Sequence, residues 1–107
     1  MEDGDFFMSE EVNDEYVKER VWEDYKAGDS ISGILVDILY NMGEYNNTLY
    51  RIRTSDEFVA VWGSKDLDDK ISKLKVNVGM KIEVTFNGLK RTSNGFDMKD
   101  FTVVVLD

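Results

Sequence analysis

Two periods of hydrophobic and polar residues follow each other along this chain. Over residues 9–26 apolar side chains recur at intervals of four, which predicts an amphipathic helix that ends before Gly28. The apolar stripe of this helix consists of Val17, Val21 and Tyr25, with Trp22 beside them. From Ser30 onwards β-branched and alternating runs replace the helical period, so the remainder of the chain is predicted to be mainly β.

Five strands and one internal helix are predicted after residue 30. The strands are expected at residues 31–40, 48–54, 57–63, 80–86 and 96–106, with loops at 41–47 and 87–95. The helix is expected over residues 64–75, because Ser64 is a suitable N-cap, aspartates fill the first turns and lysines fill the last. Leu67, Ile71 and Leu74 form its apolar stripe.

The order of these elements predicts the fold. Three strands, one helix and two further strands is the connectivity of an OB-fold, a five-stranded Greek-key barrel. We therefore expect a mainly β OB-fold barrel over residues 28–107, with one helix between strands 3 and 4, and a partly helical acidic segment over residues 1–27. No repeat, linker or proline divides the chain further.

Composition narrows the chemistry. The 107 residues include no Cys and no His, which removes disulfides, the usual zinc sites and thiol or imidazole catalysis. The sequence lacks a glycine-rich phosphate loop and a nucleophile elbow, and Asp66, Asp68 and Asp69 are better interpreted as helix-start residues than as metal ligands. We expect no enzyme activity, no metal and no cofactor. No apolar run spans a bilayer and the N-terminus is acidic, so a cytoplasmic protein without a membrane partner is expected.

The net charge of −9 is concentrated at one end. Residues 1–30 contain eleven acidic and three basic residues, whereas residues 31–107 contain eleven acidic and ten basic residues. The body of the protein is therefore nearly neutral and does not repel phosphate as a whole. Three interpretations of the acidic segment remain open: a solvated surface, a handle for a basic partner, or a phosphate mimic that covers a binding groove.

The alternation of the second and third strands predicts a binding face. OB-folds bind single strands across these two strands, between the loop after strand 1 and the loop joining strands 4 and 5. Tyr50, Ile52, Val59 and Val61 are expected to point into the barrel. The opposite parity then exposes Leu49, Arg51, Arg53, Phe58, Ala60 and Trp62. Guanidinium groups would hold phosphates and the aromatic rings would stack on bases.

Each of these candidates has an ordinary structural alternative. Trp62 is also suited to the barrel core, and Phe58 to a cluster with the N-terminal helix. In the loop expected between strands 4 and 5, Lys90 and Arg91 are candidates for closing over a phosphate backbone. An ordinary polar hairpin turn would have a similar sequence. Tyr45, in the first loop, is a further candidate for stacking.

The same residues carry a resemblance to a known family. Residues 28–36 (GDSISGILV), 50–52 (YRI), 59–64 (VAVWGS) and 78–82 (VGMKI), with Leu67, resemble the small OB-fold single-stranded DNA-binding proteins of bacteriophages, over roughly residues 28–105. The chain also resembles barrels of the replication protein A family, in which an aromatic residue matching Trp62 stacks on a base. This resemblance implies coating of single-stranded DNA, with little sequence preference, during phage DNA replication or recombination in the host cytoplasm.

Other readings and partners remain open. Replication or recombination proteins are possible partners of the acidic N-terminal segment. The main alternative hypothesis to DNA binding is that the chain is an OB-fold protein interaction module. A third hypothesis is that it is an acidic DNA mimic that inhibits a DNA-binding protein. An exposed edge strand or the N-terminal helix would suffice to build a homo-oligomer, and the sequence leaves the oligomeric state open.

Overall fold

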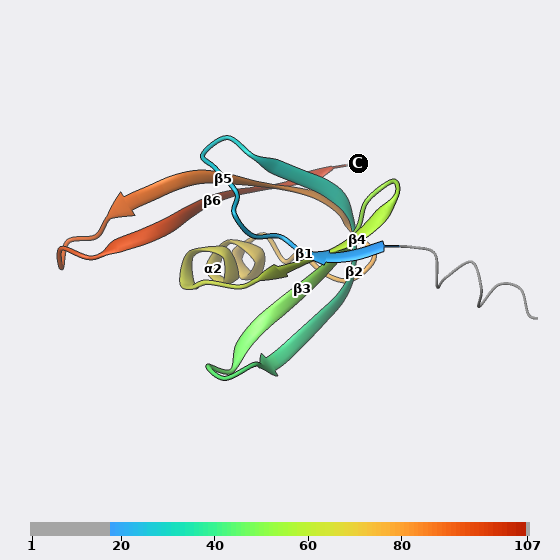
Figure 1. Ribbon diagram of the computed structural model, residues 1–107, viewed down its shortest axis with the longest axis horizontal. Coiled ribbons are helices and arrows are strands. Elements are labelled where there is room, and N and C mark those ends of the chain that lie inside the picture. Colours follow the sequence, from blue (N-terminus) through green and yellow to red (C-terminus); the bar gives the residue numbers. More distant parts are fainter. Residues whose placement is uncertain (1–17, 107) are drawn as a thin grey trace, which may run out of the picture.

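One mixed sheet of six strands and a single helix make up the part of the chain that the computed structural model describes, residues 18–106 (Figure 1). The elements are β1 (Lys18–Val21), β2 (Ser30–Met42), β3 (Asn47–Arg53), β4 (Glu57–Trp62), α2 (Lys65–Lys73), β5 (Lys81–Arg91) and β6 (Asp97–Leu106). The mainly β class and the position of the helix between the third and fourth predicted strands, which are β4 and β5, are confirmed.

The strands are arranged in a Greek key. The spatial order is β1-β4-β3-β2-β5-β6. β2, β3 and β4 form consecutive antiparallel hairpins, and the connection through α2 returns β5 to the free side of β2. The expectation of five strands and a closed barrel needs correction, because a sixth strand is present and the sheet is not closed: β1 and β6 are its edges.

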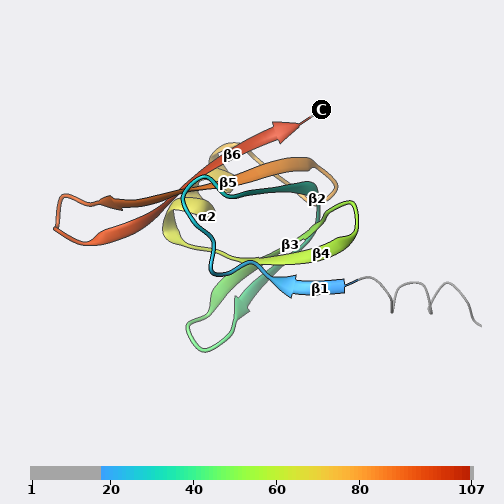
Figure 2. The ribbon, with the colours of Figure 1, turned by 45° about the horizontal axis from the view of Figure 1, so that its top comes forward.

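The bend of β2 lets one strand serve both halves of the sheet. Its first part pairs with β5 and its second part with β3, with Ile34 taking part in both ladders. The backbone of β3 passes so close to Gly33 that a Cβ there would overlap the carbonyl oxygen of Arg53. A register shift follows between Leu35 and Asp37. Glycine and the bulge together allow the sharp curvature that wraps the sheet around its core (Figure 2).

The helix expected over residues 9–26 is not confirmed. Residues 9–17 lie outside the described residues, and from Lys18 the chain is a strand that runs parallel to β4. The backbone N–H of Trp22 continues this contact by donating to the carbonyl of Ala60 at 2.8 Å. Because side chains alternate between the two faces of the extended chain, Val21 is 40% exposed whereas Trp22 is only 6% exposed. Pairing with an otherwise free edge and burial of an indole together outweigh the helical pattern.

Residues 22–29 cross from β4 to β5 and cover one end of the core (Figure 2). The Tyr25 ring lies 4.5 Å from the rings of both Trp22 and Phe86, measured between centroids. Phe101 of β6 is fully buried against the same group. The segment then joins β5 through the Gly28 N–H, which donates to the Phe86 carbonyl at 2.7 Å. This aromatic cluster links the two halves of the open sheet.

The internal helix follows the prediction closely. The Ser64 hydroxyl caps it by accepting from the Leu67 N–H at 3.3 Å. Leu67 and Ile71 are buried, as predicted. Leu74, which was expected in the same stripe, is 46% exposed because it is the C-cap residue, beyond the last helical turn.

Asp66 joins α2 to β6. Its carboxylate is 8% exposed and accepts from the Phe101 N–H at 2.9 Å and from the Lys70 ammonium at 2.9 Å. Burial alone would raise the pKa of Asp66, but the hydrogen bond from Phe101 and the charge of Lys70 outweigh it and hold the pKa below its usual value. Asp66 therefore connects the helix to an edge strand in its ionised form.

Stability is expected to fall in acid because of this carboxylate. A lowered folded-state pKa contributes stability above the unfolded value of about 3.9, and this contribution is lost as the pH falls through the folded pKa. Asp66→Asn should lower stability at neutral pH and flatten its dependence on pH below about 4. Urea unfolding at a series of pH values measures both effects, with the exposed helix residue Asp69→Asn as the control. An equally steep acid dependence in Asp66→Asn would contradict the assignment.

Candidate nucleic-acid interface

The outward-facing side of β3 and β4 is the face that the alternation predicted. Tyr50, Ile52, Val59 and Val61 are buried with at most 4% exposure, so the predicted parity is confirmed. Of the opposite set, Arg53 and Trp62 are exposed, and Leu49, Arg51 and Phe58 are half-buried. Ala60 was expected to be exposed but is buried, because β1 lies alongside it.

Two arginines and one aromatic ring form a cluster at one end of this face. The guanidinium carbons of Arg51 and Arg53 lie 5.1 and 5.0 Å from the centre of the Phe58 ring. Arg51 also donates to Glu19 of β1 at 3.0 Å and to Asp37 of β2 at 2.6 Å. Both carboxylates raise the pKa of Arg51, and the hydrogen bond to Glu19 has the larger effect. The structure therefore places Arg51, Arg53 and Phe58 together.

The residues of this cluster already contact one another and two neighbouring carboxylates. Phe58 already meets two cations, so a base would have to displace a guanidinium in order to stack on it. Arg51 is neutralised by two acids, and a phosphate would have to compete with them. Arg53 has no ion-pair partner within residues 18–106 and is exposed. Of the two predicted phosphate ligands on this face, Arg53 is the more accessible.

Trp62 lies at the other end of the face, at the end of β4. Its side chain is 40% exposed, which contradicts a core position. One face of a pocket of about 330 Å³ is formed by this indole, and the β2–β3 turn supplies the remainder through Met42, Gly43, Glu44, Tyr45 and Asn47. A Cβ on Gly43 would lie 3.2 Å from the indole, and Gly43 has a positive φ of 74°, so glycine suits the close approach of the turn to the ring. Tyr45 is 77% exposed beside it, and two candidate stacking residues thus share one pocket.

Trp62 also lines a second pocket, of about 510 Å³. It is lined by Trp22, Glu23, Asp24, Tyr25, Trp62, Phe86, Leu89 and Lys99. The Lys99 ammonium donates to the Tyr25 hydroxyl at 2.9 Å and lies 5.1 Å from the centre of that ring. Trp62 lines both pockets, so they adjoin at this indole, one beside the β2–β3 turn and the other beside Phe86, Leu89 and Lys99 of the β5–β6 hairpin. The two pockets together are called the Trp62 groove below.

Two residues of this groove were missed by the sequence analysis. Tyr25 was predicted to lie in the apolar stripe of a helix, whereas its ring packs against Phe86 of β5. Lys99 lies in the alternating run of the last strand, opposite Leu89. Its two-residue spacing from Phe101, which places both side chains on one face of the strand, was the available signal, but the matching register on β5 was not predictable from the sequence alone.

Lys90 and Arg91 lie on a strand and not in a loop. β5 continues to Arg91, so the turn of the β5–β6 hairpin is confined to residues 92–96. The Lys90 ammonium lies 3.2 Å from Asp100 and 3.5 Å from Asp66, and the hydrogen bond to Asp100 is the main cause of its raised pKa. Arg91 pairs with Asp97 at 3.2 Å on the exposed hairpin. Both cations therefore have acidic partners next to them.

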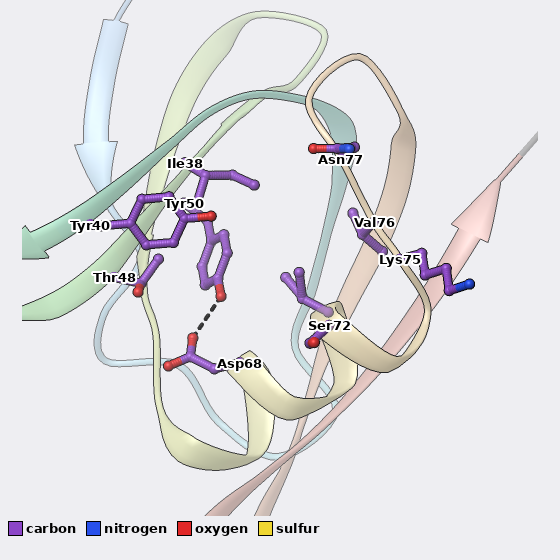
Figure 3. Close-up of a pocket in the computed structure, with 10 residues that line it drawn as sticks. Ile38, Tyr40, Thr48, Tyr50, Asp68, Ser72, Lys75, Val76 and Asn77 are labelled. Atoms are coloured by element: carbon purple, nitrogen blue, oxygen red, sulfur yellow. Dashed lines mark hydrogen bonds between the residues drawn. The ribbon is translucent and has the colours of Figure 1, made fainter.

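A third pocket, of about 390 Å³, lies on the opposite side of the β2–β3 hairpin, against α2 (Figure 3). Within it the Tyr50 hydroxyl points at Asp68 and donates to its carboxylate at 2.6 Å (Figure 3). Burial, followed by this hydrogen bond, raises the pKa of Tyr50. The contact ties β3 to the helix, and it faces away from the predicted binding face.

Within residues 18–106 no three acidic side chains come together as a metal site would require. None of the helical residues that the structure describes forms a segment long and apolar enough to cross a membrane.

Comparison with known proteins gives one viral relative. The chain is 27% identical over 90 residues to "Uncharacterized protein 2" of Halorubrum pleomorphic virus 1, an alignment that covers 82% of this chain and 71% of that protein. No protein-family model matches the chain. No solved structure matches it either.

Proposed function

We propose that this protein binds single-stranded DNA with little sequence preference, in the groove centred on Trp62. The observation that carries the proposal is the half-exposed indole shared by two adjoining pockets, with Tyr45 on one side and Tyr25 and Lys99 on the other. Flat rings in a row along a groove suit unpaired bases, because every base has a face that can stack.

The topology supports the same proposal. An OB-fold is a partly open Greek-key barrel that binds oligonucleotides between the loop after its first strand and the loop joining its last two strands. If β2 to β6 correspond to those five strands, the groove at Trp62 lies between the β2–β3 turn and the β5–β6 hairpin, which are these two loops. β1 would then be an addition to the barrel along β4.

In this proposal the bases and phosphates have separate contacts. Bases would stack on Trp62 and Tyr45, while Arg53 and Lys99 offer charge to the backbone. Arg51, Lys90 and Arg91 would take part by exchanging a carboxylate partner for a phosphate. A viral relative fits a role in organising DNA during the replication or recombination of a viral genome inside the host cell.

Fluorescence anisotropy with labelled oligo-dT of about 20–30 nucleotides tests the proposal, a length chosen from the site sizes of OB-folds. We expect saturable binding that quenches tryptophan fluorescence. With about four phosphate contacts, log affinity should fall against log salt with a slope near −3, at about −0.7 per contact. Absence of binding at low salt by folded protein would refute it.

Removing the charge of Glu19 is expected to strengthen DNA binding. Glu19→Gln releases Arg51 from its bidentate partner, and an exposed ion pair of this kind is worth roughly 0.2–1 kcal/mol, or up to about a fivefold gain in affinity. The salt slope should steepen by about 0.7. Glu57→Gln is the matched control, because Glu57 pairs with Arg20 on the same edge of the sheet. Equal gains from both variants would assign the effect to net charge alone.

A protein interaction module is the second candidate, and the ion pairs favour it. Three of the five cations proposed to contact phosphates already have acidic partners, and Glu23 and Asp24 line the groove beside Lys99. A basic segment of a partner protein would meet Glu23 and Asp24, for which residues 18–106 provide no ion-pair partner. The same contact would serve an acidic DNA mimic that inhibits a DNA-binding protein. Binding of a polylysine peptide but not of oligo-dT would select this alternative.

A further inference from the structure

No strand within residues 18–106 pairs with the outer edge of β6. β6 pairs with β5 on its other side. Midway along β6, α2 supplies the missing partners: the Phe101 N–H donates to Asp66, and the Phe101 carbonyl accepts from Lys70. Beyond Phe101, no α2 side chain within the described residues forms a hydrogen bond with the backbone of β6.

The geometry of the β5–β6 ladder identifies which groups remain. Phe101 directs its N–H and carbonyl away from β5, and in an antiparallel ladder this direction repeats at every second residue. Val103 and Val105 therefore direct their N–H and carbonyl groups outward from the sheet. The arrangement is a short template for another strand.

The side chains along this edge also lack the usual protection. Residues 101–106 (FTVVVL) contain no charge, proline or glycine. Val104 is 43% exposed on one face of the strand, and Val105 is 37% exposed on the other. Edge strands that stay unpaired commonly carry a lysine, a proline or a bulge, whereas an edge that is apolar on both faces resembles a strand inside a sheet.

We propose that β6 pairs antiparallel with β6 of a second copy of this chain, centred on Val104. In this register Val103 lies opposite the partner copy's Val105, and each such pair exchanges two hydrogen bonds through the outward groups. The two copies of Val104 meet at the centre, and Thr102 lies opposite Leu106. The six-stranded sheets of the two copies become one continuous sheet.

The absence of charge along residues 101–106 suits pairing with a second copy of the same strand. The pairing segment is neutral and apolar, so the antiparallel register sets no like charges against each other across the new ladder. Residues 1–17 of the same chain contain seven acidic residues and no basic one, which makes them a poor match for a valine-rich edge. A strand with twofold self-complementarity also forms a closed dimer and not an open fibre.

Sedimentation velocity over a range of protein concentrations, with and without added salt, tests the dimer. We expect a dimer that strengthens with salt, because each copy carries a net charge of −9 and salt screens the repulsion. Val104→Lys should weaken it about tenfold or more, since two ammonium groups would meet at the centre. Val21→Lys is the matched control: Val21 is 40% exposed on β1, the opposite edge.

Amide hydrogen exchange provides a second test of the dimer that does not depend on a variant. The N–H groups of Val103 and Val105 should be protected in concentrated protein and should exchange on dilution. A monomer at all concentrations, a dimer weakened by Val21→Lys and not by Val104→Lys, or protection that does not change with concentration would overturn the proposal. None of these outcomes depends on whether the protein binds DNA.

Discussion

Trp22→Ala is expected to lower the free energy of unfolding by about 3–5 kcal/mol, the usual cost of removing a large buried aromatic side chain. The indole is 6% exposed and lies against Tyr25 and Phe101, where it links β1 to the core. A domain of this size has roughly 5–15 kcal/mol of stability in total, so the variant should be marginally folded. Urea unfolding followed by circular dichroism measures the loss.

Trp62→Ala is the matched control for this prediction, because it makes the same chemical change at a side chain that is 40% exposed. Its unfolding midpoint should move far less. If Trp22→Ala cost less than about 1 kcal/mol, the segment from Lys18 to Trp22 would not be part of the folded domain, and the position of β1 would be wrong.

The same Trp62→Ala variant is expected to weaken binding to oligo-dT at least tenfold. A stacked base contributes on the order of 1–3 kcal/mol, and about 1.4 kcal/mol corresponds to a factor of ten. Trp62 is the shared wall of both pockets of the groove, so its loss removes the central stacking surface. Fluorescence anisotropy at constant salt measures the change.

Two variants make this result interpretable. Trp62→Phe keeps a flat ring and should recover part of the affinity. Phe96→Ala removes another exposed aromatic ring, 70% exposed at the tip of the β5–β6 hairpin and outside the two pockets, and should leave binding almost unchanged. Normal binding by a folded Trp62→Ala protein would remove the indole from the proposed interface.

The elements with local signals were predictable. Ser64 caps α2, and the parity of β3 and β4 follows from their alternating residues, because a capping hydroxyl and a two-residue period act within a few residues of each other. The N-terminal helix was predicted on a pattern of the same kind and is not confirmed. The four-residue spacing of Val21 and Tyr25 is typical of a helix. The observed strand forms because β4 is available as a partner in the folded sheet, and the local sequence does not show this.

The candidate site shows the same division. The residue types for stacking and for phosphate contacts were readable from the sequence, and Trp62 and Tyr45 do share a pocket. Which cations are free was not readable, since Arg51 meets Glu19 and Asp37 from two other strands, and Lys90 meets Asp66 from the helix. Sequence separation in these pairs ranges from 14 to 32 residues, and only the chain's path brings them together.

By itself, the sequence determined the mainly β class, the single internal helix, the outward parity of Trp62 and the confinement of excess acid to one end of the chain. These properties depend on local periods and on composition. The tertiary structure alone decided that β1 extends the sheet beside β4, that the sheet stays open, that most candidate cations are paired and that no strand of residues 18–106 covers the edge at Val104. Each of these depends on which distant segments meet, and contacts of that kind leave no periodic signal in a single sequence.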